Sequence, residues 1–179
     1  MDLDLERASI TLGAIMTPPP TRAVSLFALL GFLIITFCAA FVGARASMSS
    51  TEMYATMIKP GWSPPGWLFG PVWSVLYCLM AVAAWRVWKL VGLRSAVTVY
   101  LIHLIFQALW SWLFFGLGRA DWAMVDIVIL WLMILWLVFA FRRYDKMACL
   151  MMVPYLLWVT FAAALNGTLW ALNGGVLPR

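Results

Sequence analysis

Residues 23–42 of this chain read AVSLFALLGFLIITFCAAFV, a stretch with no charged side chain. A helix of that length is about 30 Å long, which matches the hydrocarbon core of a bilayer. Similar apolar stretches follow, and we expect membrane spans at about 23–42, 69–85, 95–117, 122–141 and 147–172. None of them alternates apolar and polar residues as a membrane β-strand does. Each span must then be α-helical to satisfy its backbone in lipid, and the sequence predicts an all-α membrane protein with a five-helix bundle.

Composition excludes the other broad classes. Of the 179 residues, 65% are hydrophobic and 11% are charged, whereas a soluble domain is about one quarter charged. We expect an N-terminal tail at 1–21 and one transmembrane domain at 22–179. The acidic residues Asp2, Asp4 and Glu6 do not fit a signal peptide, which begins with basic residues. A plain tail is expected, with an interfacial helix over 8–16 as the alternative.

The basic residues predict the orientation. Eight of the 12 Lys and Arg residues lie in the N-terminal tail and the second and fourth connections between spans. The side of a membrane protein that carries more Lys and Arg is normally cytoplasmic. The N-terminus and these two connections should therefore be cytoplasmic, and the C-terminus and the first connection should lie on the opposite side. Topology accounts for the net charge of +5, so no nucleic-acid partner is expected.

The first connection, from Gly43 to Leu68, is much longer than the others. Long loops in compact bundles are often functional lids, and prolines keep this one extended while it displays tryptophans. The expected lid residues are Lys59, Pro60, Trp62, Pro64, Pro65 and Trp67. Interfacial anchoring in an aromatic belt is the alternative for these tryptophans, particularly Trp67.

Three spans carry faces that mix aromatic and hydrogen-bonding side chains at helical spacing. Such faces are costly in lipid and normally point inward. They comprise Phe69, Trp73, Tyr77, Met80 and Ala84; His103, Gln107, Trp110 and Phe114; and Tyr155, Trp158, Ala162 and Leu165, with Asn166 beside the last face. Facing one another, they would form a slot for a flat apolar molecule. The alternative is that these residues only pack the helices together.

Individual reactive residues give few signals of chemistry. His103 is the only histidine, and it is either a haem ligand or a hydrogen-bonded residue of the bundle interior. Asp126 is expected to pair with Arg119 or with the loop backbone near the start of its helix, and a role in a proton relay is the alternative. The three cysteines lack metal-ligand spacing, so no metal site is expected. No catalytic constellation is apparent.

Several motifs resemble the translocator protein family, also called the tryptophan-rich sensory proteins (TspO/MBR) or peripheral-type benzodiazepine receptors. The resemblance covers about residues 23–173 and all five spans. It rests on the Pro/Trp segment 59–67, Pro71-Val72-Trp73-Ser74-Val75-Leu76-Tyr77, Trp110-Ser111-x-x-Phe114-Phe115-Gly116, Ala123-x-Val125-Asp126 and Val153-Pro154-Tyr155-Leu156-x-Trp158. It implies a five-helix bundle whose first loop caps an internal pocket, a homodimer, and binding of protoporphyrin IX, haem or hydrophobic drugs, with no obligatory cofactor.

The resemblance also implies which residues face the ligand. Together with the stripes, the expected set is Tyr54, Trp73, Tyr77, His103, Gln107, Trp110, Phe114, Tyr155, Trp158, Ala162 and Leu165. Gln107 stands where the family usually has Asn, and the C-terminal cholesterol motif is missing. Porphyrin binding or sensing is the favoured function. The alternatives are light-dependent porphyrin degradation, in which Trp73 and Trp158 would act, and passive transport of porphyrin, sterol or lipid.

Overall fold

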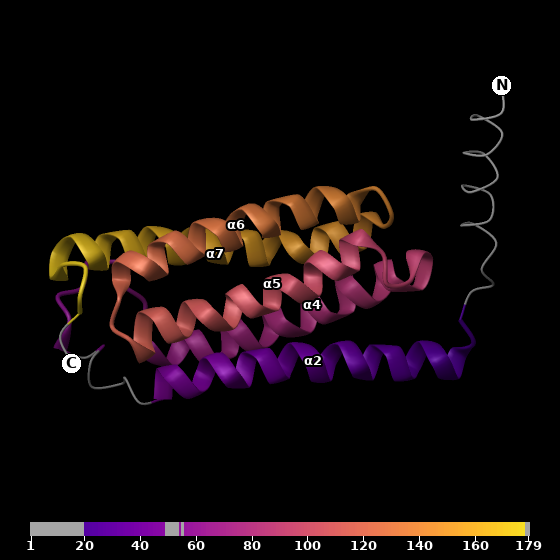
Figure 1. The fold of residues 1–179 in the computed structure, drawn as a ribbon, viewed down its shortest axis with the longest axis horizontal. Coiled ribbons are helices and arrows are strands. Elements are labelled where there is room, and N and C mark those ends of the chain that lie inside the picture. Colours follow the sequence, from indigo (N-terminus) through magenta and orange to yellow (C-terminus); the bar gives the residue numbers. More distant parts are fainter. Residues whose placement is uncertain (1–19, 49–53, 55, 178–179) are drawn as a thin grey trace, which may run out of the picture.

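The computed structural model describes residues 20–48, 54 and 56–177, and most of them belong to five long helices (Figure 1). Each helix is long and apolar enough to cross a membrane, which confirms the five-helix prediction and makes this a multi-pass integral membrane protein. A 3₁₀ turn, η1 (Gly66–Leu68), leads into the second long helix, and a π-helical turn, η2 (Trp112–Gly116), extends the third. The long helices are α2 (Arg22–Met48), α4 (Phe69–Val91), α5 (Ser95–Ser111), α6 (Ala120–Arg142) and α7 (Lys146–Asn173).

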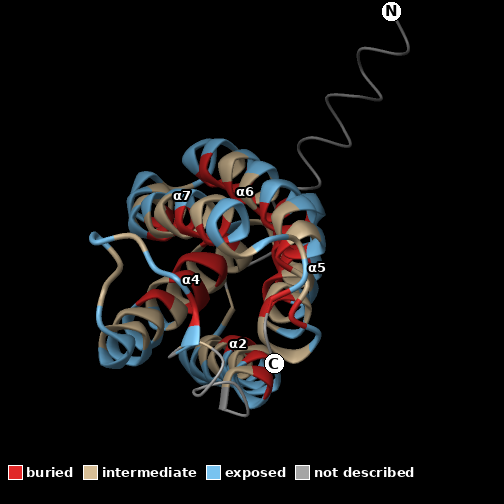
Figure 2. Cartoon of the chain, turned by 90° about the vertical axis from the view of Figure 1, so that its left-hand side faces the viewer, coloured by how far each residue is buried: buried red, intermediate tan, exposed pale blue. Residues whose placement is uncertain are grey.

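Viewed end-on, the helices form a ring in the order α2, α4, α7, α6, α5 and back to α2 (Figure 2). Buried residues face the centre of this ring and exposed ones face outward. Small side chains allow close packing: Ala81, Ala83 and Ala84 on α4 are completely buried. The large buried residues Tyr100 and Tyr155 fill the middle of the same core. Outward-facing apolar side chains are what a helix needs in contact with lipid.

Two helices run further than the sequence predicted. Helix α2 continues past residue 42 to Met48, so the first connection starts after Met48 and not at Gly43. Helix α4 continues past residue 85 to Val91 and includes Arg86 and Lys89. Long basic side chains can extend from a helix end toward the membrane surface, and here both have partners. Arg86 pairs with Asp145 at 2.7 Å, and the Lys89 ammonium lies 3.8 Å from the Trp85 ring centroid.

The connection between α6 and α7 is held by Asp145, the N-cap of α7. Its side chain accepts hydrogen bonds from the backbone N–H groups of Met147 and Ala148. Partial burial alone would raise the pKa of Asp145, but hydrogen bonds from Ala148, Arg86 and Met147 and the Arg86 charge outweigh it and lower the pKa below its usual value. The carboxylate therefore stays ionised near neutral pH and joins α4 to the start of α7.

The opposite end of the bundle is closed by the chain after α7. The Leu177 N–H donates to the Gly118 carbonyl at 2.7 Å, and Val176 forms a bridge with Arg119. The expected pairing of Arg119 with Asp126 is wrong, because Arg119 instead binds Asp121 at 2.6 Å. Asp121 lies two residues from Arg119, whereas Asp126 lies more than a turn deeper in α6 and is 4% exposed. Its Oδ2 has no partner among the described residues.

Candidate functional site: an aromatic cavity inside the bundle

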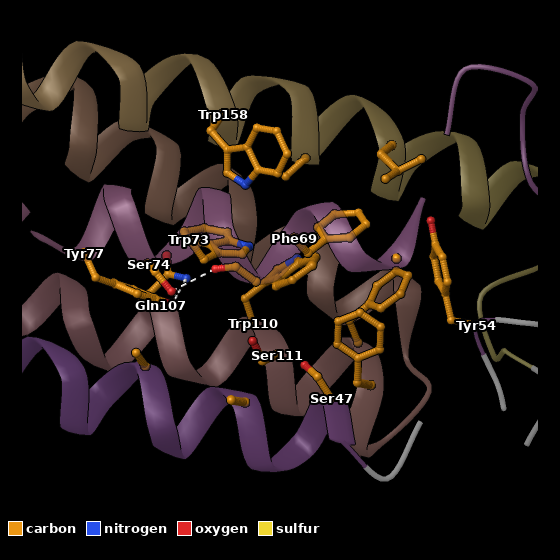
Figure 3. Close-up of a pocket in the computed structure, with 18 of the residues that line it drawn as sticks. Ser47, Tyr54, Phe69, Trp73, Ser74, Tyr77, Gln107, Trp110, Ser111 and Trp158 are labelled. Carbon is orange, nitrogen blue, oxygen red and sulfur yellow. Dashed lines mark hydrogen bonds between the residues drawn. The ribbon is translucent and has the colours of Figure 1, made fainter. Parts of the chain in front are cut away.

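A cavity of about 680 Å³ lies between α2, α4, α5 with η2, and α7. Its volume falls in the range of about 300–1,000 Å³ that is usual for small-molecule sites. Figure 3 shows aromatic side chains from different helices converging on it. The lining residues are Phe37, Ala40, Phe41, Ala44, Ser47, Tyr54, Gly66, Phe69, Gly70, Trp73, Ser74, Tyr77, Gln107, Trp110, Ser111, Phe114, Phe115, Trp158, Ala162, Leu165, Asn166 and Leu169.

One wall is formed where α4 faces α7. Trp73 and Tyr77, four residues apart on α4, stack with ring centroids 5.4 Å apart. Trp158 on α7 meets Trp73 edge-to-face, at 6.4 Å and an interplanar angle of 89°. Both arrangements lie in the range that aromatic pairs prefer. Phe69 completes this wall, with its ring 6.0 Å from that of Trp158.

The α5 wall depends on the π-helical turn. Trp110 and Phe114 stack at 5.4 Å, and Phe115 meets the Trp110 ring edge-on at 5.9 Å. The π-helical turn η2 begins at Trp112 and carries both phenylalanines, and both line the cavity. Such turns are rare and often found at functional sites.

A short polar chain lies at the end of the cavity where Tyr77 sits. The Tyr155 hydroxyl donates to Gln107 Oε1 at 2.7 Å, and Gln107 Nε2 donates to the Tyr77 hydroxyl at 3.3 Å. Figure 3 shows Gln107 and Tyr77 meeting beside Trp73. The side-chain amide thereby links α5 to both α4 and α7.

Other polar atoms of the cavity wall lack partners. The indole N–H groups of Trp110 and Trp158 and Oδ1 of Asn166 are buried without a hydrogen-bond partner among the described residues. The indole nitrogen of Trp158 points toward Trp73 (Figure 3). A buried polar group without a partner costs about 1–3 kcal/mol, and a ligand that supplies one removes that cost. None of the described lining residues is charged, so the interior can offer hydrogen bonds but no ion pair.

All but two of the predicted ligand-facing residues line this cavity; the exceptions are His103 and Tyr155. His103 is completely buried, with its Nδ1 against the Tyr100 carbonyl and its ring 5.9 Å from that of Tyr155. Tyr155 is also completely buried; its hydroxyl binds Gln107, and its ring meets the Trp73 ring edge-on at 6.1 Å. These two residues therefore support the wall from behind. Among the described residues, no group of three or more His, Cys, Asp or Glu could hold a metal ion.

The first loop meets the outer end of the cavity through Tyr54 and Gly66, while none of the six predicted lid residues lines it. Trp62 packs edge-on against Phe161 of α7 at 5.7 Å, and Trp67 is 72% exposed. Asn173 at the end of α7 clamps the loop by accepting from the Ile58 N–H and donating to the Ile58 carbonyl, both at 2.9 Å.

Lys59 donates to the Tyr54 carbonyl at 2.8 Å, with its ammonium 4.8 Å from the centroid of the Tyr54 ring. Burial raises the pKa of Tyr54, and the Ser63 hydroxyl offsets part of that rise. The Tyr54 hydroxyl is therefore a neutral donor near neutral pH. Residues 49–53 and 55 of the predicted lid loop lie outside the described residues, as does the predicted tail up to residue 19.

The contribution of α2 was missed from the sequence. Phe37, Ala40, Phe41, Ala44 and Ser47 form the side of the cavity opposite α7. These residues recur at intervals of three and four, but apolar side chains occur all around α2. No polar face marks which side turns inward, so only contacts with neighbouring helices reveal it.

Comparison with known proteins agrees with this architecture. Residues 30–171 match the model of the TspO/MBR family. The chain is 43% identical to "Tryptophan-rich protein TspO" of Chlorobaculum tepidum over 67% of this chain and 78% of that protein. It is 38% identical to "Tryptophan-rich sensory protein" of Cereibacter sphaeroides over 79% and 91% of the two chains. It is 33% identical to "Translocator protein" of Ovis aries over 89% and 95%.

Proposed function

The chain belongs to the TspO/MBR family of membrane proteins, and we propose that it binds a tetrapyrrole such as protoporphyrin IX or haem in the aromatic cavity as a membrane sensor. Membership of this family supports a general membrane role in tetrapyrrole handling or sensing and in binding hydrophobic ligands. The tetrapyrrole itself, its place in the cavity and the consequence of its binding form the proposal.

The observation that carries the proposal is an uncharged aromatic cavity with unpaired hydrogen-bonding groups. Trp73, Trp110 and Trp158 present indole surface from three different helices, which suits a flat conjugated ring. The unpaired donors suit nitrogen or oxygen atoms of the ligand. Because no described lining residue is charged, the propionates of a porphyrin would have to lie at the outer mouth, near Lys59 or Arg45.

The test is a titration of the purified protein with protoporphyrin IX in the dark, following the porphyrin absorption band and tryptophan quenching. We expect saturable binding at micromolar ligand. Trp73→Phe should weaken it about fivefold, because losing an aromatic contact costs about 1 kcal/mol. The matched control is Trp136→Phe, since Trp136 on α6 is 46% exposed and does not line the cavity. Non-saturable uptake that equals partition into empty detergent micelles would refute the proposal.

Light-dependent porphyrin degradation is a second candidate. Trp73 has the rings of Tyr77, Tyr155 and Trp158 within 6.4 Å, so these oxidisable neighbours could donate an electron to a Trp73 radical cation left after one-electron oxidation. Molecular oxygen would be the oxidant. Replacing Trp73 and Trp158 by Phe should slow oxygen-dependent bleaching of bound porphyrin under light. Bleaching no faster than that of free porphyrin in detergent would remove this candidate.

Two further parts of the proposal concern the assembly. We place the N-terminus and the connections α4–α5 and α6–α7 in the cytoplasm, because Lys89, Arg94, Arg142, Arg143 and Lys146 lie at that end. We also propose a homodimer. Reaction of single introduced cysteines with a membrane-impermeant reagent tests the first point, and crosslinking in native membranes tests the second.

A further inference from the structure

The end of the cavity where Tyr77 lies is the inner end. There the donor and the acceptor of each hydrogen bond are fixed, and this order of donors and acceptors is the polarity of the site. Gln107 carries one acceptor and two donors on its amide, and both tyrosine partners can act either way. The distances distinguish the two directions. The 2.7 Å contact from Tyr155 to Gln107 is typical of an O–H···O bond, and the 3.3 Å contact from Gln107 to Tyr77 is that of a longer N–H···O bond. Tyr155 therefore holds the amide oxygen, and the amide nitrogen faces Tyr77.

This arrangement leaves the proton of the Tyr77 hydroxyl free. Among the described residues, that hydroxyl accepts one hydrogen bond and donates none. Tyr77 lines the cavity, and its ring is held by stacking on Trp73 at 5.4 Å and by an edge contact with Phe37 at 6.0 Å. The ring cannot turn away without losing both contacts, so the free O–H is offered to whatever occupies the cavity.

We propose that Tyr155, acting through the Gln107 amide, fixes the Tyr77 hydroxyl as a hydrogen-bond donor, so that the inner end of the cavity selects ligands with an acceptor such as a carbonyl oxygen or a ring nitrogen. Tyr155 is a positioning residue here, because it is completely buried and does not line the cavity. The inference deepens the proposed function, since it rests on the same cavity.

Removing the Tyr155 hydroxyl should reverse the direction of the hydrogen bond between Gln107 and Tyr77. In Tyr155→Phe the Gln107 oxygen loses its donor, and the amide is free to turn so that its oxygen, instead of its nitrogen, faces the Tyr77 hydroxyl. Tyr77 would then donate to Gln107 and present only its lone pairs to the ligand. The preference of the cavity should move from acceptors to donors.

Three flat tricyclic probes of nearly equal size test this: 9-fluorenone has a carbonyl acceptor, carbazole has an N–H donor, and fluorene has neither. Their dissociation constants would be measured by calorimetry in one detergent, and partition into micelles cancels when variants are compared. Tyr155→Phe should weaken fluorenone about three- to tenfold, leave fluorene unchanged and tighten carbazole, as expected from the loss or gain of one hydrogen bond. Tyr77→Phe should weaken fluorenone by a similar factor and should not tighten carbazole.

The matched control is Tyr100→Phe. Tyr100 is also completely buried with a single hydroxyl contact, to Thr36 at 2.5 Å, and it does not line the cavity. This variant should leave the preference among the three probes unchanged. The infrared carbonyl stretch of bound fluorenone gives an independent reading, because a hydrogen bond from Tyr77 lowers its frequency. That lowering should disappear in both Tyr155→Phe and Tyr77→Phe and persist in Tyr100→Phe.

Equal changes for all three probes in Tyr155→Phe would mean that Tyr155 only packs the bundle, which overturns the inference. Failure of every probe to bind the unmodified protein saturably would overturn it too. The proposed function fails in a different way. If protoporphyrin IX does not bind while the probes keep the expected preferences, the polarity of the cavity holds and its tetrapyrrole ligand does not.

Discussion

Filling the cavity from α7 tests most directly whether ligands bind inside the bundle. Ala162 lines the cavity, whereas Ala164, two residues further along the same helix, is exposed on the outer face. Leucine is a good helix former, so Ala→Leu leaves the helix intact at either position. At Ala162 the larger side chain enters space that the ligand would occupy, and at Ala164 it enters lipid or detergent.

The expected size of the effect follows from packing. Inserting extra methylene groups into a filled site costs about 1–3 kcal/mol, which corresponds to a loss of affinity of about 5- to 150-fold. The empty protein should not suffer, because the added carbons fill part of a cavity of about 680 Å³. Burial of each extra CH₂ contributes about 0.8 kcal/mol. Ala162→Leu should therefore melt at the same temperature as the unmodified protein or higher while binding protoporphyrin IX more weakly.

The assay is the dark protoporphyrin IX titration, run beside thermal unfolding followed by circular dichroism. Ala164→Leu should bind like the unmodified protein. The reasoning is refuted if Ala162→Leu is well folded and binds as tightly as Ala164→Leu. In that case the ligand would lie on the outer surface or in the detergent, and the aromatic walls would serve only to pack the helices.

Other parts of the structure give further predictions. Asn173→Ala removes the clamp on the first loop, so amide hydrogen exchange at Ile58 should become about fivefold faster by mass spectrometry, since one hydrogen bond contributes about 1 kcal/mol. Asp145→Ala should destabilise the protein by about 1 kcal/mol through loss of the N-cap. Because the pKa of Asp145 is lowered by folding, this contribution is complete above about pH 4 and disappears as the pH falls through the lowered value, so thermal melts of variant and parent should converge there. Gly118 has a φ of +63°, so Gly118→Ala should lower the melting temperature, at a cost of about 1–2 kcal/mol, whereas Gly31→Ala, in open space within α2, should not.

The sequence predicted the membrane helices well because a helix must be apolar over some twenty residues to cross the lipid. It predicted their ends less well. The predicted second span ends just before Arg86 and the first ends three residues before Arg45, but Arg86 is held by Asp145 from a different connection, and Arg45 lies in the last turn of α2. A basic side chain is favourable at a helix C-terminus and can reach the membrane surface. Such partners are distant in sequence, so no local pattern identifies them.

The cavity walls were likewise predicted only where contact with lipid restricts the sequence. The inner faces of α4, α5 and α7 can be recognised in the sequence because indole, phenol and amide groups are costly in lipid. Helix α2 gives no such signal, and its contribution through Phe37 and Phe41 was missed. The depth of a residue behind the cavity wall is also invisible in the sequence. His103 and Tyr155 share helical stripes with true lining residues, yet both lie behind the wall.

The two ends of the cavity should control two different properties of the site, namely which ligands bind and how fast they enter and leave. The inner end is built from Tyr77, Gln107 and Tyr155 on three packed helices, and its polarity can change only if a side chain changes or the helices move. The outer end is built partly from a loop held by hydrogen bonds from Asn173, which are weak enough to break and reform. Substitutions at Gln107 should therefore alter which ligands bind, and substitutions in the clamp should alter how fast they enter and leave.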